Sequence, residues 1–97
     1  MKSRDEYLAT LKGQLDRWNA DVTKWEAQSD AARADLKTQY AKQIEILRAQ
    51  RENARYNLRL VEDASATAWS DLSKGADEAW EKMREAMKSA RSYFEKN

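Results

Sequence analysis

The sequence predicts an all-α protein built on one long, nearly continuous helix that self-associates into a coiled coil or helical bundle. Ala, Glu, Lys, Leu and Arg make up 51 of the 97 residues and proline is absent, a composition typical of coiled coils and long helices. Leu, Ile, Val and Phe number only 13, but 18 basic residues balance 17 acidic ones, and disorder normally requires a high net charge. The third observation is the helical spacing of the apolar residues along the whole chain.

The N-terminal third carries a heptad pattern. Its apolar residues recur at alternating steps of three and four, as expected for a left-handed coiled coil; they are Leu8, Leu11, Leu15, Trp18, Val22 and Trp25. Upstream, Ser3-Arg4-Asp5-Glu6 has the spacing of a capping box, in which the Ser3 hydroxyl accepts from the Glu6 amide. A helix is therefore expected to begin at about residue 3.

From Leu36 onward an eleven-residue (hendecad) repeat fits better than a heptad. One series is Leu36, Leu47, Leu58, Trp69 and Trp80, and another is Val61, Leu72, Met83 and Phe94. Eleven residues over three turns correspond to about 3.67 residues per turn, so this part is expected to run straight or slightly right-handed. The apolar spacing keeps the same helical phase through Gly75, so we interpret Gly75 as a weak point in a continuous helix. We expect residues 3–95 to form a single domain.

A single helix cannot bury its own apolar stripe, so we expect the partner to be another copy of the chain. The expected interface is Leu8, Leu11, Leu15, Trp18, Val22, Trp25, Leu36, Leu47, Leu58, Val61, Trp69, Leu72, Trp80, Met83, Met87 and Phe94. An antiparallel arrangement is favoured because pairing each residue i with residue 94 − i maps the stripe onto itself. In that register Trp25 faces Trp69, and the large Trp18 faces the small Ala76.

The residue inventory argues against an enzyme. Without Cys or His, the chain lacks cysteine nucleophiles, a histidine general base and the usual zinc ligands. Acidic residues cluster at Asp77, Glu78, Glu81 and Glu85, but basic residues among them are placed to neutralise them at helical spacing. We therefore expect no catalytic residues, no cofactor, no metal and no small-molecule substrate.

The sequence also contains features of two other classes of partner, nucleic acid and a membrane surface. A basic segment with Arg48, Arg51, Arg55 and Arg59 could meet phosphates, but its arginines are spread around the helix, so nucleic acid is not the expected partner. The apolar stripe could instead lie on a membrane surface; mixed charges on the polar face make this the alternative rather than the leading interpretation. The start of the chain lacks the apolar run of a secretory signal, and no apolar stretch is long enough to span a membrane, so a cytoplasmic location is expected.

The chain also resembles a known family. The segment RDEYLATLKGQLDRWNAD near the start and the dipeptides Ala68-Trp69 and Ala79-Trp80, eleven residues apart with Gly75 between them, resemble a family of small bacterial coiled-coil proteins described as stress-response proteins. The resemblance covers about residues 3–95. It implies a cytoplasmic bacterial protein associated with stress and provides no catalytic residues. A weaker likeness to apolipoprotein-type helices implies lipid binding.

Overall fold

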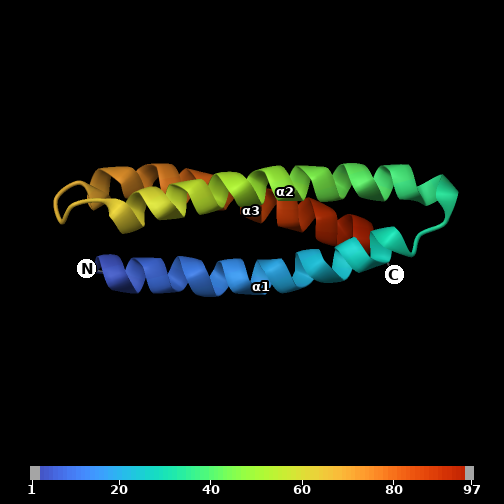
Figure 1. The fold of residues 1–97 in the computed structure, drawn as a ribbon, viewed down its shortest axis with the longest axis horizontal. Helices are drawn as coiled ribbons and strands as arrows, with labels where there is room; N and C mark the ends of the chain where they lie inside the picture. Colours follow the sequence, from blue (N-terminus) through green and yellow to red (C-terminus); the bar gives the residue numbers. More distant parts are fainter. Residues whose placement is uncertain (1–2, 96–97) are drawn as a thin grey trace.

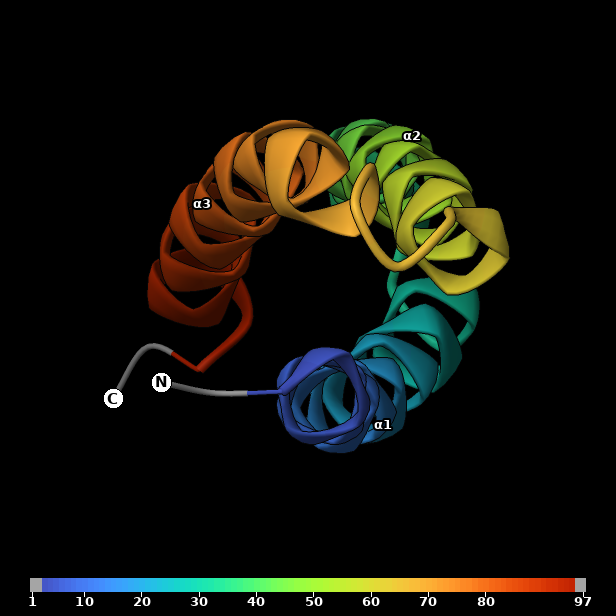
Figure 2. The same cartoon turned by 90° about the vertical axis from the view of Figure 1, so that its left-hand side faces the viewer.

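The computed structural model describes residues 3–95, which form three α-helices: α1 (Arg4–Asp30), α2 (Ala34–Asp63) and α3 (Trp69–Phe94). The predicted all-α class is thereby confirmed for the described residues. α1 and α3 run in the same direction and α2 runs opposite to both (Figure 1). Viewed end-on, the three helices surround a common centre (Figure 2). The result is an elongated three-helix bundle, 51 Å along its longest axis.

The continuous helix expected from the sequence is divided at two places, residues 31–33 and 64–68. The physical reason is that folding back lets one chain cover its own apolar stripe, whereas an extended helix leaves that stripe in water. Gly75 is not one of the break points, because it lies inside α3 and no described residue has positive φ.

Local hydrogen bonds hold the start of α1 and the turn that precedes α3. The Ser3 hydroxyl accepts from the Glu6 amide at 3.2 Å, so the predicted N-cap of α1 is confirmed. Before α3, the Ser65 hydroxyl accepts from the Ala68 amide at 3.2 Å, and the Ser65 carbonyl accepts from the Trp69 amide. Serine is a preferred residue at such positions because its side chain satisfies an amide that the helix leaves free.

The apolar stripe forms the core of this single chain. Of the residues predicted to form an interface between copies, thirteen are buried here: Leu8, Leu11, Leu15, Trp18, Val22, Trp25, Leu47, Leu58, Val61, Trp80, Met83, Met87 and Phe94. Trp69 and Leu72 are partly buried against the same core. Leu36 is the exception, since it remains 37% exposed near the start of α2.

The helices are not equally close to one another. The backbones of α2 and α3 lie close together over the greatest length, and those of α1 and α3 over the least. Small buried residues, Ala54 on α2 and Ala76 and Ala90 on α3, allow close approach of the first pair. α1 has large residues along its inner face and therefore lies further from α3.

Candidate functional site

Aromatic side chains join α1 to α3. Three pairs cross between these helices, with ring centroids 5.6–6.3 Å apart: Tyr7 with Trp69, Trp18 with Trp80, and Trp25 with Phe94. We call these six residues the aromatic seam. Pairs at such separations add to the free energy gained from burial alone. The aromatic seam is therefore the candidate site of the bundle.

At one end of the seam, the hydroxyl of Tyr7 donates to the carboxylate of Asp77, with 2.5 Å between the oxygens. The carbonyl oxygen of Ser73 lies 3.1 Å from the same hydroxyl. Burial raises the pKa of Tyr7 above its ordinary value, and the hydrogen bond and negative charge of Asp77 raise it further. All three effects disfavour the phenolate, so Tyr7 is a hydrogen-bond donor and is poorly suited to act as a base or nucleophile.

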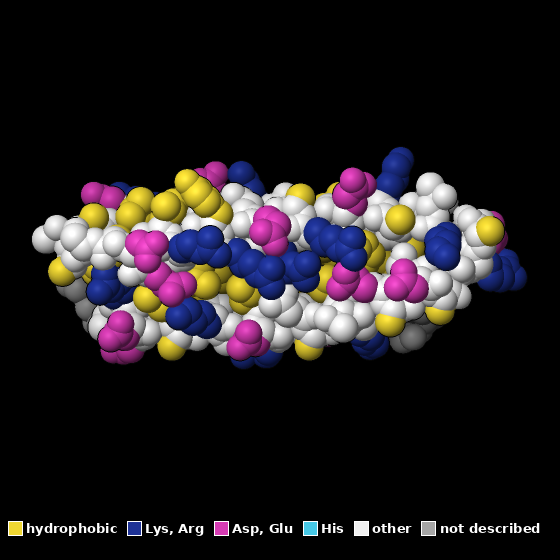
Figure 3. Space-filling view, in the orientation of Figure 1, with side chains coloured by type: hydrophobic (Ala, Val, Ile, Leu, Met, Phe, Trp, Pro, Cys, Tyr) yellow, Lys and Arg dark blue, Asp and Glu magenta, His cyan; other side chains and the backbone are white. Residues whose placement is uncertain are grey.

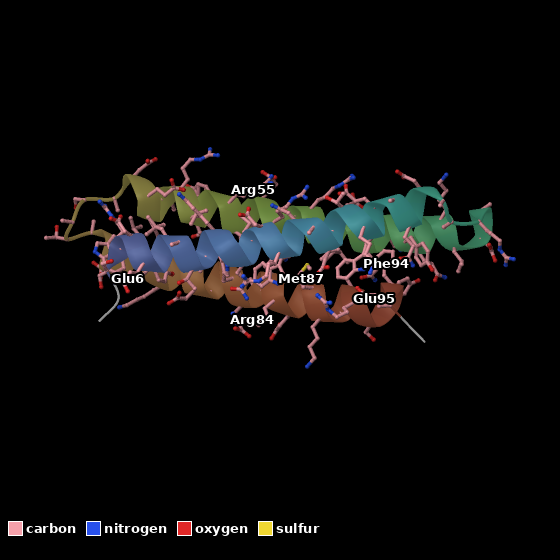
Figure 4. All side chains as sticks on the ribbon, turned by 90° about the horizontal axis from the view of Figure 1, so that it is seen from below. Glu6, Arg55, Arg84, Met87, Phe94 and Glu95 are labelled. Atoms are coloured by element: carbon pink, nitrogen blue, oxygen red, sulfur yellow. The ribbon has the colours of Figure 1, made fainter. Side chains whose placement is uncertain are left out.

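At the other end, charged groups surround Trp25. Its indole N–H donates to the Glu95 carboxylate at 3.0 Å. The Arg91 guanidinium lies 5.6 Å from the centre of the Trp25 ring and 2.7 Å from the Asp21 carboxylate. Figure 4 shows Phe94 and Glu95 at the end of α3 beside α1. Because the Arg91 cation, the Asp21 and Glu95 carboxylates and the Trp25 indole contact one another, this cluster stabilises the docking of α1 on α3.

Beside the Tyr7–Asp77 contact lies a groove of about 300 Å³ between α1 and α3. Its lining includes Gln14, Asp77, Trp80 and Arg84. Trp80 is only 2% exposed, and no acceptor among the described residues lies within hydrogen-bond distance of its indole N–H. Arg84, labelled in Figure 4, pairs with Glu81 on its own helix. The groove therefore combines apolar surface, from Leu11 and Trp80, with charged groups of both signs.

The basic residues considered for nucleic acid lie on α2 in different settings. Arg48 pairs with Glu26 of α1, and Arg55 pairs with Glu52 of α2. Arg51 is partly buried, while Arg59 is exposed. Lys and Arg side chains do gather along the middle of one face, but Asp and Glu side chains lie beside them (Figure 3). On this face the basic side chains are mixed with acidic ones and do not form a continuous basic surface.

The predicted acidic cluster is likewise divided among different partners. Asp77 accepts from Tyr7, Glu78 pairs with Lys82 and Glu81 pairs with Arg84. Within residues 3–95, no group of three or more acidic side chains is arranged to hold a metal ion.

Sequence reasoning missed the polar contacts that accompany the seam. Three of them join residues 70 positions apart: Tyr7 to Asp77, Asp21 to Arg91 and Trp25 to Glu95. The common separation follows from α1 and α3 being parallel and in one register. Complementary polar residues repeated at that separation are the signal that could have revealed the arrangement.

Comparison with family models, with curated proteins and with solved structures finds no match to this chain. Among the described residues, no helix has the length and apolar character needed to cross a membrane.

Proposed function

We propose that this chain is a non-enzymatic structural or interaction protein that associates with itself through its helical stripe. The observation that carries the proposal is the aromatic seam, in which the large side chains of α1 and α3 meet pairwise. The chemistry-bearing groups beside the seam, notably Tyr7 and Arg91, are engaged in contacts between helices. Their arrangement supports a role in holding helices together.

An association with stress in a bacterial cytoplasm is proposed on the resemblance alone. The sequence elements that carry it, such as Ala68-Trp69 and Ala79-Trp80, lie at and within α3. Trp69 and Trp80 both take part in the aromatic seam. The residues that carry the resemblance therefore lie on the same surface of α3 as the aromatic seam.

The test is sedimentation velocity over a wide range of protein concentration, with helicity followed by circular dichroism. We expect a fully helical species in plain buffer whose mass rises from the 11.3 kDa of one chain toward that of a dimer as concentration increases. A helical species that stays at the mass of one chain up to millimolar concentration would contradict self-association.

Lipid-surface binding is the second candidate, and one observation favours it. α1 contacts α3 chiefly through side chains, with the least extensive backbone approach in the bundle. Release of α1 would expose Trp18 and Trp25 together, and such residues partition to a membrane interface. Co-sedimentation with anionic vesicles, accompanied by a changed Trp emission, would favour this function over self-association; unchanged emission and no co-sedimentation would exclude it.

A further inference from the structure

The connection between α1 and α2 has an unusual composition for a turn. It reads Ala31-Ala32-Arg33 and is followed by Ala34, all residues with strong helix propensity. Ala31 retains helical dihedral angles, Arg33 is extended, and no described residue has positive φ. The Arg33 side chain makes no capping hydrogen bond to α2. Local sequence therefore favours helix at the point where the chain folds back.

Two of the three charges at this turn also oppose a break. α1 ends at Asp30 and has no basic residue in its last turn, and α2 begins after Arg33, whereas Asp35 in the first turn of α2 is favourably placed and pairs with Arg33. A carboxylate at a helix C-terminus and a cation at an N-terminus both interact unfavourably with the helix dipole. The turn before α3 differs, because the Ser65 hydroxyl accepts a hydrogen bond from the Ala68 amide within it. The 31–33 turn is thus held by the packing of α1 on the other helices rather than by its own chemistry.

The buried stripes of α1 and α2 are in phase across this turn. Adding 36 to a buried position of α1 gives a buried position of α2 in five cases, and 36 residues are about ten turns at about 3.6 residues per turn. The pairs are Leu8 and Ile44, Leu11 and Leu47, Trp18 and Ala54, Val22 and Leu58, and Trp25 and Val61. If residues 31–33 became helical, Arg4–Asp63 would form one helix with a single apolar face.

Contacts between α1 and α2 indicate how two such straightened helices would pair. Lys12 pairs with Glu62 and Glu26 pairs with Arg48, and in both pairs the residue numbers add to 74. If two straightened helices from different chains kept this register, residue 37 would lie on the two-fold axis. Leu36, the stripe residue left 37% exposed in one chain, would then lie beside that axis and be covered.

We propose that the self-associated form is a dimer in which two copies exchange α1 after residues 31–33 become helical. This inference rests on the proposed self-association and specifies its geometry. Every contact between α1 and the rest of the bundle, including the aromatic seam, is remade with the partner copy, so only the turn and the new contact around Leu36 distinguish the two states. Exchange of identical elements in this way is a low-cost route to a dimer.

The decisive variant is Arg33→Pro. Arg33 has φ −67°, which proline adopts readily, and its N–H donates to no backbone carbonyl in the described chain. Proline within the continuous helix would remove a hydrogen bond and clash with the preceding turn. We expect Arg33→Pro to stay helical by circular dichroism and to lose the dimer, while Arg33→Ala retains or increases it. Leu36→Lys, a change at an exposed position of the single chain, should also reduce dimer formation.

Crosslinking identifies which helices meet. Chains carrying only Lys12→Cys are refolded with chains carrying only Glu62→Cys and treated with a short bis-maleimide; the natural chain has no cysteine. Exchange predicts a covalent 12–62 dimer, and predicts none from Ser29→Cys mixed with Ser65→Cys, the pair that the 94 − i register would join. Small-angle scattering should show a particle longer than the 51 Å bundle, since 60 residues of helix span roughly 90 Å.

Two results would overturn the proposed exchange of α1, and they can be distinguished from each other. A dimer that persists in Arg33→Pro, without a 12–62 crosslink in the natural background, would show self-association by another surface. A wild-type chain that remains monomeric up to millimolar concentration would overturn both the exchange and the proposed self-association.

Discussion

Tyr7 of α1 and Asp77 of α3 are joined by a hydrogen bond of 2.5 Å between residues 70 positions apart in the chain. The bond fixes the axial register of the two parallel helices at one end. The Trp25–Glu95 hydrogen bond, with the same separation in sequence, fixes it at the other end. Between them the aromatic seam supplies contact area but less directional specificity. We therefore expect polar contacts to determine register and aromatic contacts to determine most of the stability.

Tyr7→Phe should lower the free energy of unfolding near neutral pH by about 1.5–3 kcal/mol, the usual range for a hydrogen bond to a charged group, or less because the site is partly open to water. Urea denaturation measures the change. Tyr56→Phe is the matched control, since Tyr56 is 59% exposed. Equal effects of the two substitutions would contradict a special role for the Tyr7–Asp77 contact.

The pH dependence of stability provides a second check on Tyr7. Its pKa is raised in the folded protein by burial and by Asp77, so the unfolded chain ionises first. The contribution of the neutral hydroxyl is intact below pH 10, the ordinary value, and is lost as pH rises above it. Wild type should therefore lose more stability than Tyr7→Phe between pH 9 and 11 in parallel urea titrations. Identical slopes would show that Tyr7 ionises equally in both states.

The Asp21–Arg91 contact should add a smaller increment. Both groups are partly exposed, at 31% and 50%, and pairs of this kind typically contribute about 0.2–1 kcal/mol. A double-mutant cycle with Asp21→Asn and Arg91→Gln isolates the coupling, and thermal unfolding at low and high salt reports its screening. Coupling that is absent at low salt would mean that Arg91 acts only through its position over the Trp25 ring.

The two glycines offer a matched comparison of helix propensity with packing. An added Cβ at Gly13 meets only Arg17 at 3.9 Å, whereas at Gly75 it meets the Asn57 amide oxygen at 3.1 Å. Gly13→Ala should therefore raise the free energy of unfolding by about 1 kcal/mol. Gly75→Ala should gain less, because Asn57 of the closely packed α2 must shift. Combining Gly75→Ala with Asn57→Ala should restore the missing part in denaturant titrations; a larger gain at Gly75 than at Gly13 would contradict the crowding.

The sequence allowed the helical class, the Ser3 cap and the large core residues other than Ile44 to be predicted, although those residues were expected to meet between copies. Helical spacing identifies which face of each segment is buried whether the covering helix belongs to the same chain or to another. Leu36 shows the limit of the method, because its spacing is correct but it lies at the turn where one chain has no helix to cover it.

The turns and the register could not be predicted in the same way. Ala31-Ala32-Arg33 contains no residue that ends a helix, so the fold-back there depends on distant contacts. Ser65 carries a usable signal, since serine is common in turns and its hydroxyl accepts from the Ala68 amide. The register 94 − i paired Trp18 with Ala76, whereas within the chain Trp18 packs on Trp80. Many registers bury an apolar stripe nearly equally well, and only the polar contacts between specific residues distinguish them.

Trp25 and Trp80 provide the last prediction, because they are alike in burial and differ in hydrogen bonding. Their exposed fractions are 0% and 2%, and each pairs with an aromatic side chain across the seam. The Trp25 indole N–H donates to Glu95, while that of Trp80 meets no acceptor among the described residues. Both substitutions to phenylalanine remove the same number of atoms, so their packing losses should be similar.

Trp25→Phe also removes a hydrogen bond to a carboxylate, worth about 1.5–3 kcal/mol. Trp80→Phe instead removes a buried donor that has no partner within residues 3–95, and so relieves a desolvation penalty. We expect Trp25→Phe to be the more destabilising by about that amount in denaturant titration. Glu95→Gln measured beside Trp25→Phe should account for part of the difference, because it weakens the same bond without changing the core. Equal losses at the two tryptophans would mean that the Trp80 N–H finds a partner, such as water entering the groove between α1 and α3.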